Sequence, residues 1–214
     1  QQDATRKNTL IARATANQLE KALQNPRMML QQAHESHVAV RQQTEGFYLN
    51  SLLRIEPLFQ RIEILNKQGI VREVVPFDPQ MQGIDRSGQA FFQALRSGKS
   101  EYWSNAFISL PQGIPSVVLA VAFDDHDMAA HLNLTSLHQL IDSMQERYDP
   151  GLDIAVVDQS GVFISHHDSQ RVMQRQTLDN FLQVKELVAA GNGAQGWEDK
   201  KNRQLLSFAK VETT

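Results

Sequence analysis

The stretch 83–123 constrains the fold of this chain more than any other, because it predicts a helix followed by two antiparallel strands. Phe91 and Phe92 stand at helical spacing from the apolar residues after them, Ser87 can cap the helix start, and Gly98 falls where a helix C-cap is expected. A short helix is therefore expected between Ser87 and Gly98.

A strand pair follows this helix directly. Residues 102–109 mix aromatic with small polar side chains, the Pro-Gln-Gly turn at 111–113 reverses the chain, and residues 116–123 return as a nearly continuous apolar strand. Small-molecule sites are concave and mostly apolar, with a few placed polar groups. The helix and the hairpin together predict one wall of a ligand pocket.

The first 54 residues are rich in Gln, Ala, Leu and charged residues, which predicts a long helical region. One apolar stripe along it consists of Ala12, Ala16, Leu19 and Leu23. Because proline cannot continue a helix without losing a hydrogen bond, Pro26 predicts a break, with a second helical segment starting there. The stripe fits two partners equally well, the chain's own domain or the same helix of a second copy.

Two later hairpins resemble each other in sequence. Residues 61–75 alternate around the polar turn 66–69, residues 152–165 flank the polar turn 158–161, and each turn ends in glycine. This repetition predicts two related modules. The other expected elements are a strand at 128–134, a helix at 135–147, loop and helical residues at 168–190, and a strand pair at 197–211.

The order of these elements resembles the double-Cache family, the extracytoplasmic sensor domains of bacterial chemoreceptors, histidine kinases and cyclic-di-GMP signalling enzymes. The resemblance rests on the aromatic pair Phe91 and Phe92, the hairpin after it and the glycine turn before it, and it covers nearly the whole chain. It implies an α+β fold in which a long N-terminal helix precedes two PAS-like (Cache) modules, each an antiparallel sheet flanked by helices. The second module is expected to be incomplete.

The resemblance also implies a division of the chain and a ligand site in its first module. The implied segments are an N-terminal helical stalk at 1–57, a membrane-distal module at 58–134, a linking helix at 135–148 and a membrane-proximal module at 149–214. The candidate ligand-binding residues are Gln89, Phe91, Phe92, Trp103, Ser104, Phe107, Ser109 and His131. The three phenylalanines fit an ordinary hydrophobic core as well as they fit a pocket.

The resemblance bears on the ligand as well. In the amino-acid-binding branch of the family, an Arg two positions before the aromatic pair holds the ligand carboxylate, while a Tyr-x-Asp and a later Asp receive the ammonium group. Here Gln89 stands at the Arg position, Phe107 and Ser109 at the Tyr and Asp positions, and His131 at the later Asp position. We therefore expect a neutral or anionic ligand, not a typical α-amino acid, with His131 as the one titratable contact.

Composition excludes several classes of protein. A formal net charge of -3 with scattered Lys and Arg residues provides no basic surface for nucleic acid. The chain has no cysteine, which excludes disulfides and thiol catalysis, and no apolar run approaches the roughly 20 residues of a membrane helix. With the family resemblance, we expect a periplasmic domain that is tethered to the membrane in the full-length protein and forms a homodimer through its N-terminal helix.

No catalytic, cofactor or metal motif is expected to function here. The run from Ser165 to Asp168 has the residue types of a hydrolase, but neighbours on a strand point to opposite faces. His34 and His37 have metal-ligand spacing without a third ligand nearby in sequence, and the acidic turn 124–127 lacks the spacing of a calcium loop. We therefore expect a sensor domain and no enzyme, in which a bound small molecule shifts the linking helix relative to the N-terminal helix. The alternative is a ligand-free domain for dimerisation or for binding a partner protein.

Overall fold

The computed structural model of the chain describes residues 2–39, 45–109, 113–148, 151–179, 181–189, 194–199 and 204–211. The chain divides into two compact units, one of Gln1–Gln24 with Leu137–Thr214 and one of Asn25–Ser136. Helix α1 contributes residues to both units, whereas the sequence assigned residues 1–57 to one stalk. The predicted segment boundaries stay a prediction.

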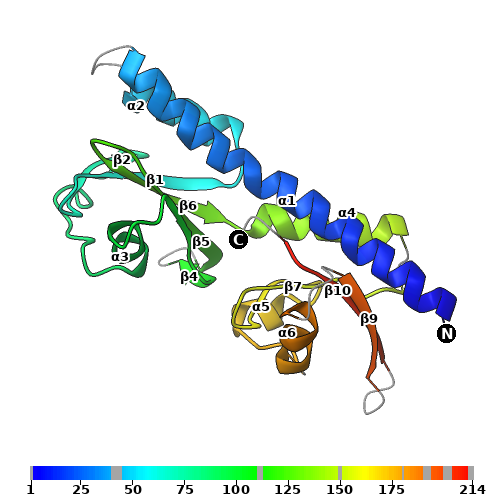
Figure 1. Cartoon of the computed structure of the whole chain (residues 1–214). Helices are drawn as coiled ribbons and strands as arrows, with labels where there is room; N and C mark the ends of the chain where they lie inside the picture. Colours follow the sequence, from blue (N-terminus) through cyan, green and yellow to red (C-terminus); the bar gives the residue numbers. More distant parts are fainter. Residues whose placement is uncertain are drawn as a thin grey trace. The chain divides into compact units, whose positions relative to one another are not determined.

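Helix α1 runs from Gln2 to Ala39 with Pro26 inside it (Figure 1). The predicted break at this proline is therefore wrong. Leu23 and Leu30 are buried on either side of Pro26, which is buried itself. Packing of this face offsets the hydrogen bond lost at a proline inside a helix, a loss of about 3 kcal/mol.

The apolar stripe of α1 packs within its own chain. Ala16, Leu19 and Leu23 are all buried in the single chain, and Ala12 is half-buried. Of the two predicted partners for the stripe, the chain's own domain is the one observed. A pairing of two chains through α1 would have to use other residues.

The unit Asn25–Ser136 is built on one six-stranded antiparallel sheet with the strand order β2-β1-β6-β5-β3, in which β4 also pairs with β5. Its strands are β1 (Phe59–Leu65), β2 (Val71–Val75), β3 (Glu101–Trp103), β4 (Phe107–Ser109), β5 (Ile114–Ala122) and β6 (Asp127–Asn133). The first hairpin and the strand predicted at 128–134 are thus confirmed.

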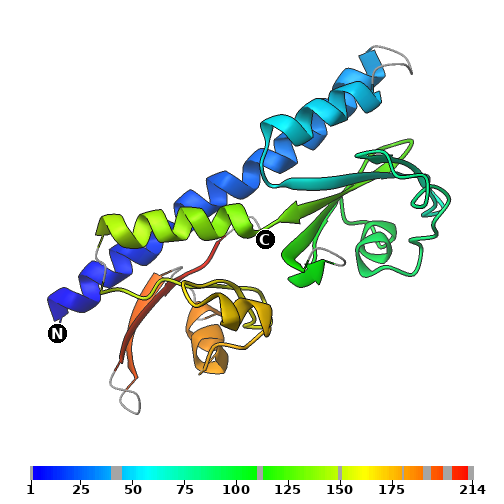
Figure 2. The same ribbon diagram turned by 180° about the vertical axis from the view of Figure 1, so that it is seen from behind.

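Helices cover both faces of this sheet (Figures 1 and 2). The C-terminal part of α1 and helix α2 (Glu45–Ile55) lie on one face, and α3 (Ala90–Arg96) lies on the other. Arg27 on α1 forms an ion pair of 2.7 Å with Glu101 on β3. The predicted α+β class, with an antiparallel sheet flanked by helices after a long N-terminal helix, is confirmed.

The helix within 83–123 forms as predicted, with a different start. Gln89 is the residue before the first helical turn, and no side chain caps it. Ser87 does not cap the helix, because α3 begins only at Ala90. The Ser87 backbone N–H donates to the Asp85 carboxylate at 2.7 Å in a turn that precedes α3. Gly98 does follow the helix end and has a φ of 99°, the left-handed conformation that glycine adopts easily.

The strand predicted at 102–109 is divided into β3 and β4. At the division, the Ser104 hydroxyl accepts a hydrogen bond from the Val118 N–H at 2.8 Å and donates one to the Asn105 carbonyl at 2.9 Å. Serine side chains compete with backbone groups for such bonds, which the aromatic pattern of the sequence did not reveal.

The unit of Gln1–Gln24 with Leu137–Thr214 is called the second unit here. Helix α4 (Thr135–Tyr148) lies beside the N-terminal part of α1 (Figures 1 and 2). The elements after α4 are β7 (Val156–Val157), β8 (Phe163–Ser165), α5 (Ser169–Met173), α6 (Phe181–Ala189), β9 (Ala194–Asp199) and β10 (Gln204–Ala209). Strand β7 pairs with β8 and β9 with β10, so the predicted second hairpin and C-terminal strand pair are present.

The two predicted hairpins share their turn geometry. In each turn the side-chain oxygen of the first residue, Asn66 or Asp158, accepts hydrogen bonds from the backbone N–H groups two and four residues later. Gly69 and Gly161 end the turns with φ values of 86° and 85°. The Gly69 carbonyl accepts a hydrogen bond from the Arg86 N–H, and the Gly161 carbonyl accepts one from the Leu178 N–H. In both cases the donor follows the glycine by the same number of residues. The sequence repeat is therefore also a structural repeat.

Candidate ligand-binding site

The candidate site lies on the sheet face that α3 covers. Phe91, Phe92 and Leu95 project from α3 into a buried apolar cluster with residues of β1, β2, β5 and β6. Phe107 on β4 is half-buried and packs against this cluster. The face is apolar over most of its area, as the helix and hairpin pattern predicted.

Four polar side chains meet on this otherwise apolar face, and we call them the Glu63 cluster. They are Arg61 and Glu63 from β1, His131 from β6, and Arg86 from the loop before α3. Glu63 accepts two hydrogen bonds from Arg86, one donated by Nε and one by Nη2, both at 3.0 Å. The Oε1 atom of Glu63 also lies 3.0 Å from Arg61 Nη2 and 3.2 Å from His131 Nε2.

The members of the Glu63 cluster differ in exposure. The Glu63 side chain is 0% exposed, whereas those of Arg61 and Arg86 are 29% and 20% exposed and that of His131 is 12% exposed. A buried carboxylate therefore holds three partly accessible nitrogen donors in fixed positions. Such preorganised guanidinium groups are suited to a carboxylate.

The carboxylate of Glu63 is ionised at neutral pH. Burial alone would raise its pKa, but the hydrogen bonds from His131 and Arg86, together with the charges of both groups, outweigh burial and lower the pKa from 4.5 to about 2. A buried charge is tolerated in a fold when it is paired and hydrogen-bonded, as this one is.

The imidazole of His131 is neutral near pH 7. Burial lowers its pKa below the usual 6.5, and the positive charges of Arg61 and Arg86 lower it further, against the hydrogen bond and charge of Glu63. Arg61 Nη2 lies 3.1 Å from Nε2 and 3.3 Å from Nδ1 of His131. Both ring nitrogens of His131 therefore lie within hydrogen-bonding distance of a neighbour in the Glu63 cluster.

The structure brings several of the predicted site residues together. Phe91, Phe107 and His131 share the α3 side of the sheet, and the Phe107 and His131 rings meet edge to face with centroids 6.3 Å apart. Phe92 is buried in the same apolar cluster. Ser109 is buried, and strand alternation places it on the same face as Phe107.

Three other predicted residues lie elsewhere. Trp103 pairs with Leu119 in the sheet register, which puts its side chain on the face opposite to Phe107, and its indole N–H is buried without a hydrogen-bond partner among the described residues. The Ser104 hydroxyl is engaged by backbone groups. Gln89 is exposed at the start of α3.

Arg86 pairs with Glu63, and Asp85 accepts a hydrogen bond from the Ser87 backbone N–H. Arg61, Glu63 and Arg86 were not among the candidate residues. The available signal was a strand in which Arg61 and Glu63 alternate with isoleucine, which is typical of a half-exposed strand. Only the packing of α3 reveals that the polar side of this strand is buried.

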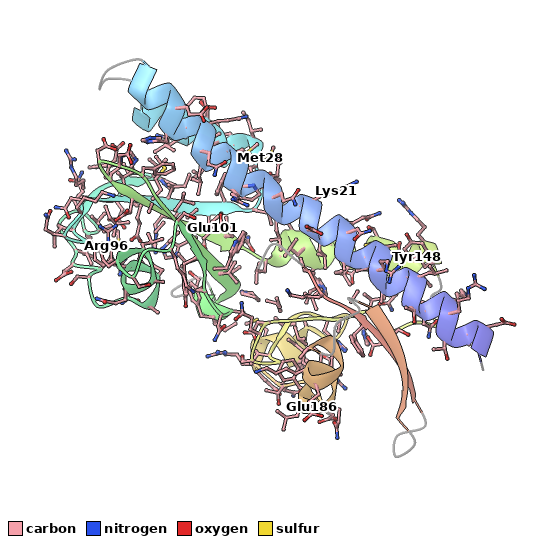
Figure 3. All side chains as sticks on the ribbon, in the orientation of Figure 1. Lys21, Met28, Arg96, Glu101, Tyr148 and Glu186 are labelled. Carbon is pink, nitrogen blue, oxygen red and sulfur yellow. The ribbon has the colours of Figure 1, made fainter. Side chains whose placement is uncertain are left out.

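A groove of about 390 Å³ opens at the other end of α3. Its lining residues are Lys67, Leu95, Arg96, Gly98, Lys99, Ser100, Ala122, Phe123 and Asp124. Arg96, labelled in Figure 3, contacts the buried Asp127 carboxylate at 2.6 and 2.7 Å, and Lys67 lies 3.2 Å from it. None of the predicted site residues lines this groove.

A serine, a histidine and an aspartate also lie in series in the second unit. His138 Nδ1 is 3.3 Å from the Ser165 hydroxyl, and His138 Nε2 is 3.4 Å from Asp142. The Ser165 residue is only 1% exposed, so a substrate carbonyl has no access to its hydroxyl. The run from Ser165 to Asp168 does not form a triad either, because His166 and His167 both contact Asp153.

Comparison with solved structures identifies the fold. No protein-family model matches the chain, and no curated protein matches it in sequence. The ligand-binding domain of the amino acid chemoreceptor PctC of Pseudomonas aeruginosa PAO1, in complex with GABA, superposes with a TM-score of 0.67 at 20% identity, over 94% of this chain and 91% of that one. The chain has the fold of a ligand-binding sensor domain.

Two further structures share this sensor-domain fold. The extracellular domain of the histidine kinase rpHK1S-Z16, described as putative, superposes with a TM-score of 0.69 at 12% identity, over 93% of this chain and 85% of that one. An extracellular ligand binding receptor from Desulfohalobium retbaense gives a TM-score of 0.70 at 15% identity over 90% of this chain. The present chain spans 36% of the length of that receptor.

The predicted exclusion of amino acids is contradicted by these comparisons. Structures with this fold are complexes with GABA, L-valine and L-norvaline. The exclusion considered charge at only three sites in the sequence, those of Gln89, the Phe107 to Ser109 segment and His131. The structure adds Arg61, Glu63 and Arg86 on the same sheet face as His131. The expectation that His131 is the one titratable ligand contact stays a prediction.

Proposed function

We propose that this chain is the extracytoplasmic ligand-binding domain of a transmembrane signalling protein of the double-Cache type. In this proposal, a small molecule with a carboxylate group, of the amino acid class, binds in the module at 58–134. The sensor-domain fold supports the role, and the solved complexes with that fold support the ligand class. None of the helices in the described part of the chain has the length and apolar character needed to cross a membrane.

The observation that carries the proposal is the Glu63 cluster within the apolar face under α3. Arg61 and His131 expose part of their side chains beside Phe107, and Glu63 fixes both. The Arg61 guanidinium is a donor for a carboxylate, and the phenylalanine rings offer an apolar surface for a side chain. We assign the ligand contacts to Arg61, Phe91, Phe107, Ser109 and His131.

The test is thermal unfolding of the 214-residue chain with matched sets of ligands. Each set holds an amino acid, the amine without its carboxylate and the acid without its amino group. A ligand at about 100 times its Kd should add roughly 2.7 kcal/mol to the free energy of unfolding, which raises Tm by several degrees. We expect shifts from the compounds that retain the carboxylate.

Two arginine variants locate the site. Arg61→Ala should abolish the ligand-induced shift, and Arg72→Ala, an exposed residue on the neighbouring strand β2, should retain it. A shift that survives Arg61→Ala would place the ligand elsewhere. A panel in which amines lacking a carboxylate give the largest shifts would contradict the proposed ligand class.

A ligand-free domain for dimerisation or partner binding is the second candidate. The observation that favours it is the burial of Phe91 and Phe92, which are 7% and 4% exposed and fill the space under α3 with side chains. Under this reading the Glu63 cluster only stabilises the sheet, and no compound in the panel changes Tm.

A further inference from the structure

His34, Asp125 and His126 come together in space although they are distant in the sequence. His34 lies on α1, and Asp125 and His126 lie in the turn between β5 and β6. Each residue offers one ligand atom, and these atoms all lie within 4.8 Å of one another. The sequence presented His34 without a third ligand and the acidic turn without a cation spacing, because the two halves of the site belong to different elements.

Ring contacts hold the two histidines in place. The His34 ring stacks on Phe123 with centroids 4.1 Å apart and an interplanar angle of 16°, and the His34 and His126 rings are 5.2 Å apart. His126 Nδ1 lies 2.8 Å from the Asp125 carboxylate.

Hydrogen bonds to its backbone also hold the turn between β5 and β6 in place. Lys67 donates hydrogen bonds to the carbonyl groups of Phe123 and His126, and its charge is paired with Asp127 at 3.2 Å. The Phe123 N–H donates to the His126 carbonyl at 3.0 Å, which closes the turn. The side chains of Asp125 and His126 are therefore presented by a well-anchored backbone.

The polar atoms of this group point to a ligand. The Nδ1 atom of His34 is buried and has no hydrogen-bond partner among the described residues. A buried polar atom without a partner lowers the stability of the fold unless something binds it. His126 is buried, with a side chain 4% exposed, whereas the Asp125 side chain is 64% exposed. The imidazole of His126 is therefore shielded from solvent, whereas the carboxylate of Asp125 is accessible to it.

We propose that His34, Asp125 and His126 bind a divalent transition-metal ion of the Zn²⁺ class. Two imidazoles and one carboxylate are ligands that suit Zn²⁺, Ni²⁺ and Cu²⁺ better than Ca²⁺ or Mg²⁺. Tetrahedral bonds of about 2.1 Å place ligand atoms roughly 3.4 Å apart, so the three ligand atoms, which lie within 4.8 Å of one another, need to approach by at most about 1.4 Å. Three protein ligands leave a fourth position open to water or to a small molecule.

The metal would link α1 to the end of the sheet. Phe123 and His34 lie on the α1 side of the sheet, whereas the Glu63 cluster lies on the α3 side. The metal site therefore does not share residues with the proposed carboxylate site, and neither depends on the other. A sensor with both would respond to two different chemical inputs.

The experiment is calorimetric titration of the untagged, chelator-treated chain with Zn²⁺. We expect one Zn²⁺ per chain, with Kd raised by at least about 10-fold in Asp125→Asn and in His34→Gln. Asp124→Asn removes a neighbouring exposed carboxylate and is the matched control, with an unchanged Kd. Asp125 is exposed, so Asp125→Asn carries the test even if His34→Gln does not fold.

Other outcomes overturn the proposal. The three residues Asp153, His166 and His167 form a second group of potential ligand atoms, with Asp153 and His167 exposed. Loss of the Zn²⁺ affinity in His167→Gln rather than in Asp125→Asn would assign the metal to that group. Absence of Zn²⁺ binding in the unmodified chain, or an unchanged Kd in Asp125→Asn, would reject the site.

Discussion

At the scale of single residues, Glu63 is the most constrained side chain on the α3 face. It is fully buried, accepts two hydrogen bonds from Arg86 and contacts Arg61 and His131. Ion pairs of this kind add little over an apolar core when complete, but breaking one leaves uncompensated charge inside the fold. Replacing the Glu63 carboxylate by an amide of the same shape should therefore lower the free energy of unfolding strongly.

Glu63→Gln should therefore lower the free energy of unfolding by about 3–5 kcal/mol, because two guanidinium groups lose their counter-charge. Chemical denaturation monitored by circular dichroism measures this. Glu73→Gln, on the neighbouring strand β2, should stay within about 0.5 kcal/mol of the parent. Equal effects of the two substitutions would contradict the central role of Glu63.

The pH dependence of stability follows from the same residues. His131 has a pKa below its unfolded value of 6.5, so the unfolded chain binds more protons than the folded one below that pH, and stability falls as pH is lowered through 6.5. The Glu63 pKa of about 2, against 4.5 unfolded, makes its contribution complete above 4.5 and lost as pH falls toward 2.

His131→Asn should remove the loss of stability that His131 causes as the pH is lowered through 6.5. Unfolding free energies measured at several pH values between about 7 and 5 should fall with pH in the parent and less steeply in the variant. His167→Asn, an exposed histidine of the other unit, is the control and should keep the parent slope. An identical slope in His131→Asn would show that the imidazole is not held neutral.

At the scale of elements, the turns that end in Gly69 and Gly161 join the two strands of each hairpin and closely approach a later segment of the chain. A Cβ atom at Gly69 would lie 2.9 Å from the Ser87 backbone, and one at Gly161 would lie 2.4 Å from the Phe181 ring. Both glycines also have positive φ. Two separate requirements therefore select glycine at the same place in each repeat.

Gly69→Ala should lower stability more than Gly98→Ala does. Both residues have positive φ, and alanine there costs about 1–2 kcal/mol, but a Cβ at Gly98 meets no atom within 4 Å. The difference between the two variants in denaturation isolates the close approach of the turn to the Ser87 backbone. Equal losses of stability in the two variants would mean that the loop before α3 moves away from the new Cβ atom without any loss of stability.

At the scale of the whole molecule, the proposed ligand should act on one unit. The Glu63 cluster and Phe107 belong to the unit Asn25–Ser136, and strands β9 and β10 belong to the other. A ligand that raises Tm should slow amide hydrogen exchange in β1, β4 and β6, because exchange there requires opening of the bound site. Slowing confined to residues after Leu137 would place the ligand in the second unit.

The sequence by itself determined the elements and the fold class. Local periodicity, turn residues and glycine positions are short-range properties, so they located the hairpins, the 83–123 unit, the helix before Tyr148 and the repeated turns. The same local rule failed at Pro26, where α1 continues because residues on both sides of the proline are buried.

Only the tertiary structure decided which charged groups share a face. Glu63 and Arg86 meet because the loop before α3 folds over β1, and His34 meets Asp125 because α1 packs against the end of the sheet. Such pairings join residues that no sequence period relates, and the polar side of β1 is indistinguishable from a solvated one until α3 covers it. Local patterns determine the elements, whereas packing between distant elements determines the charge of the site.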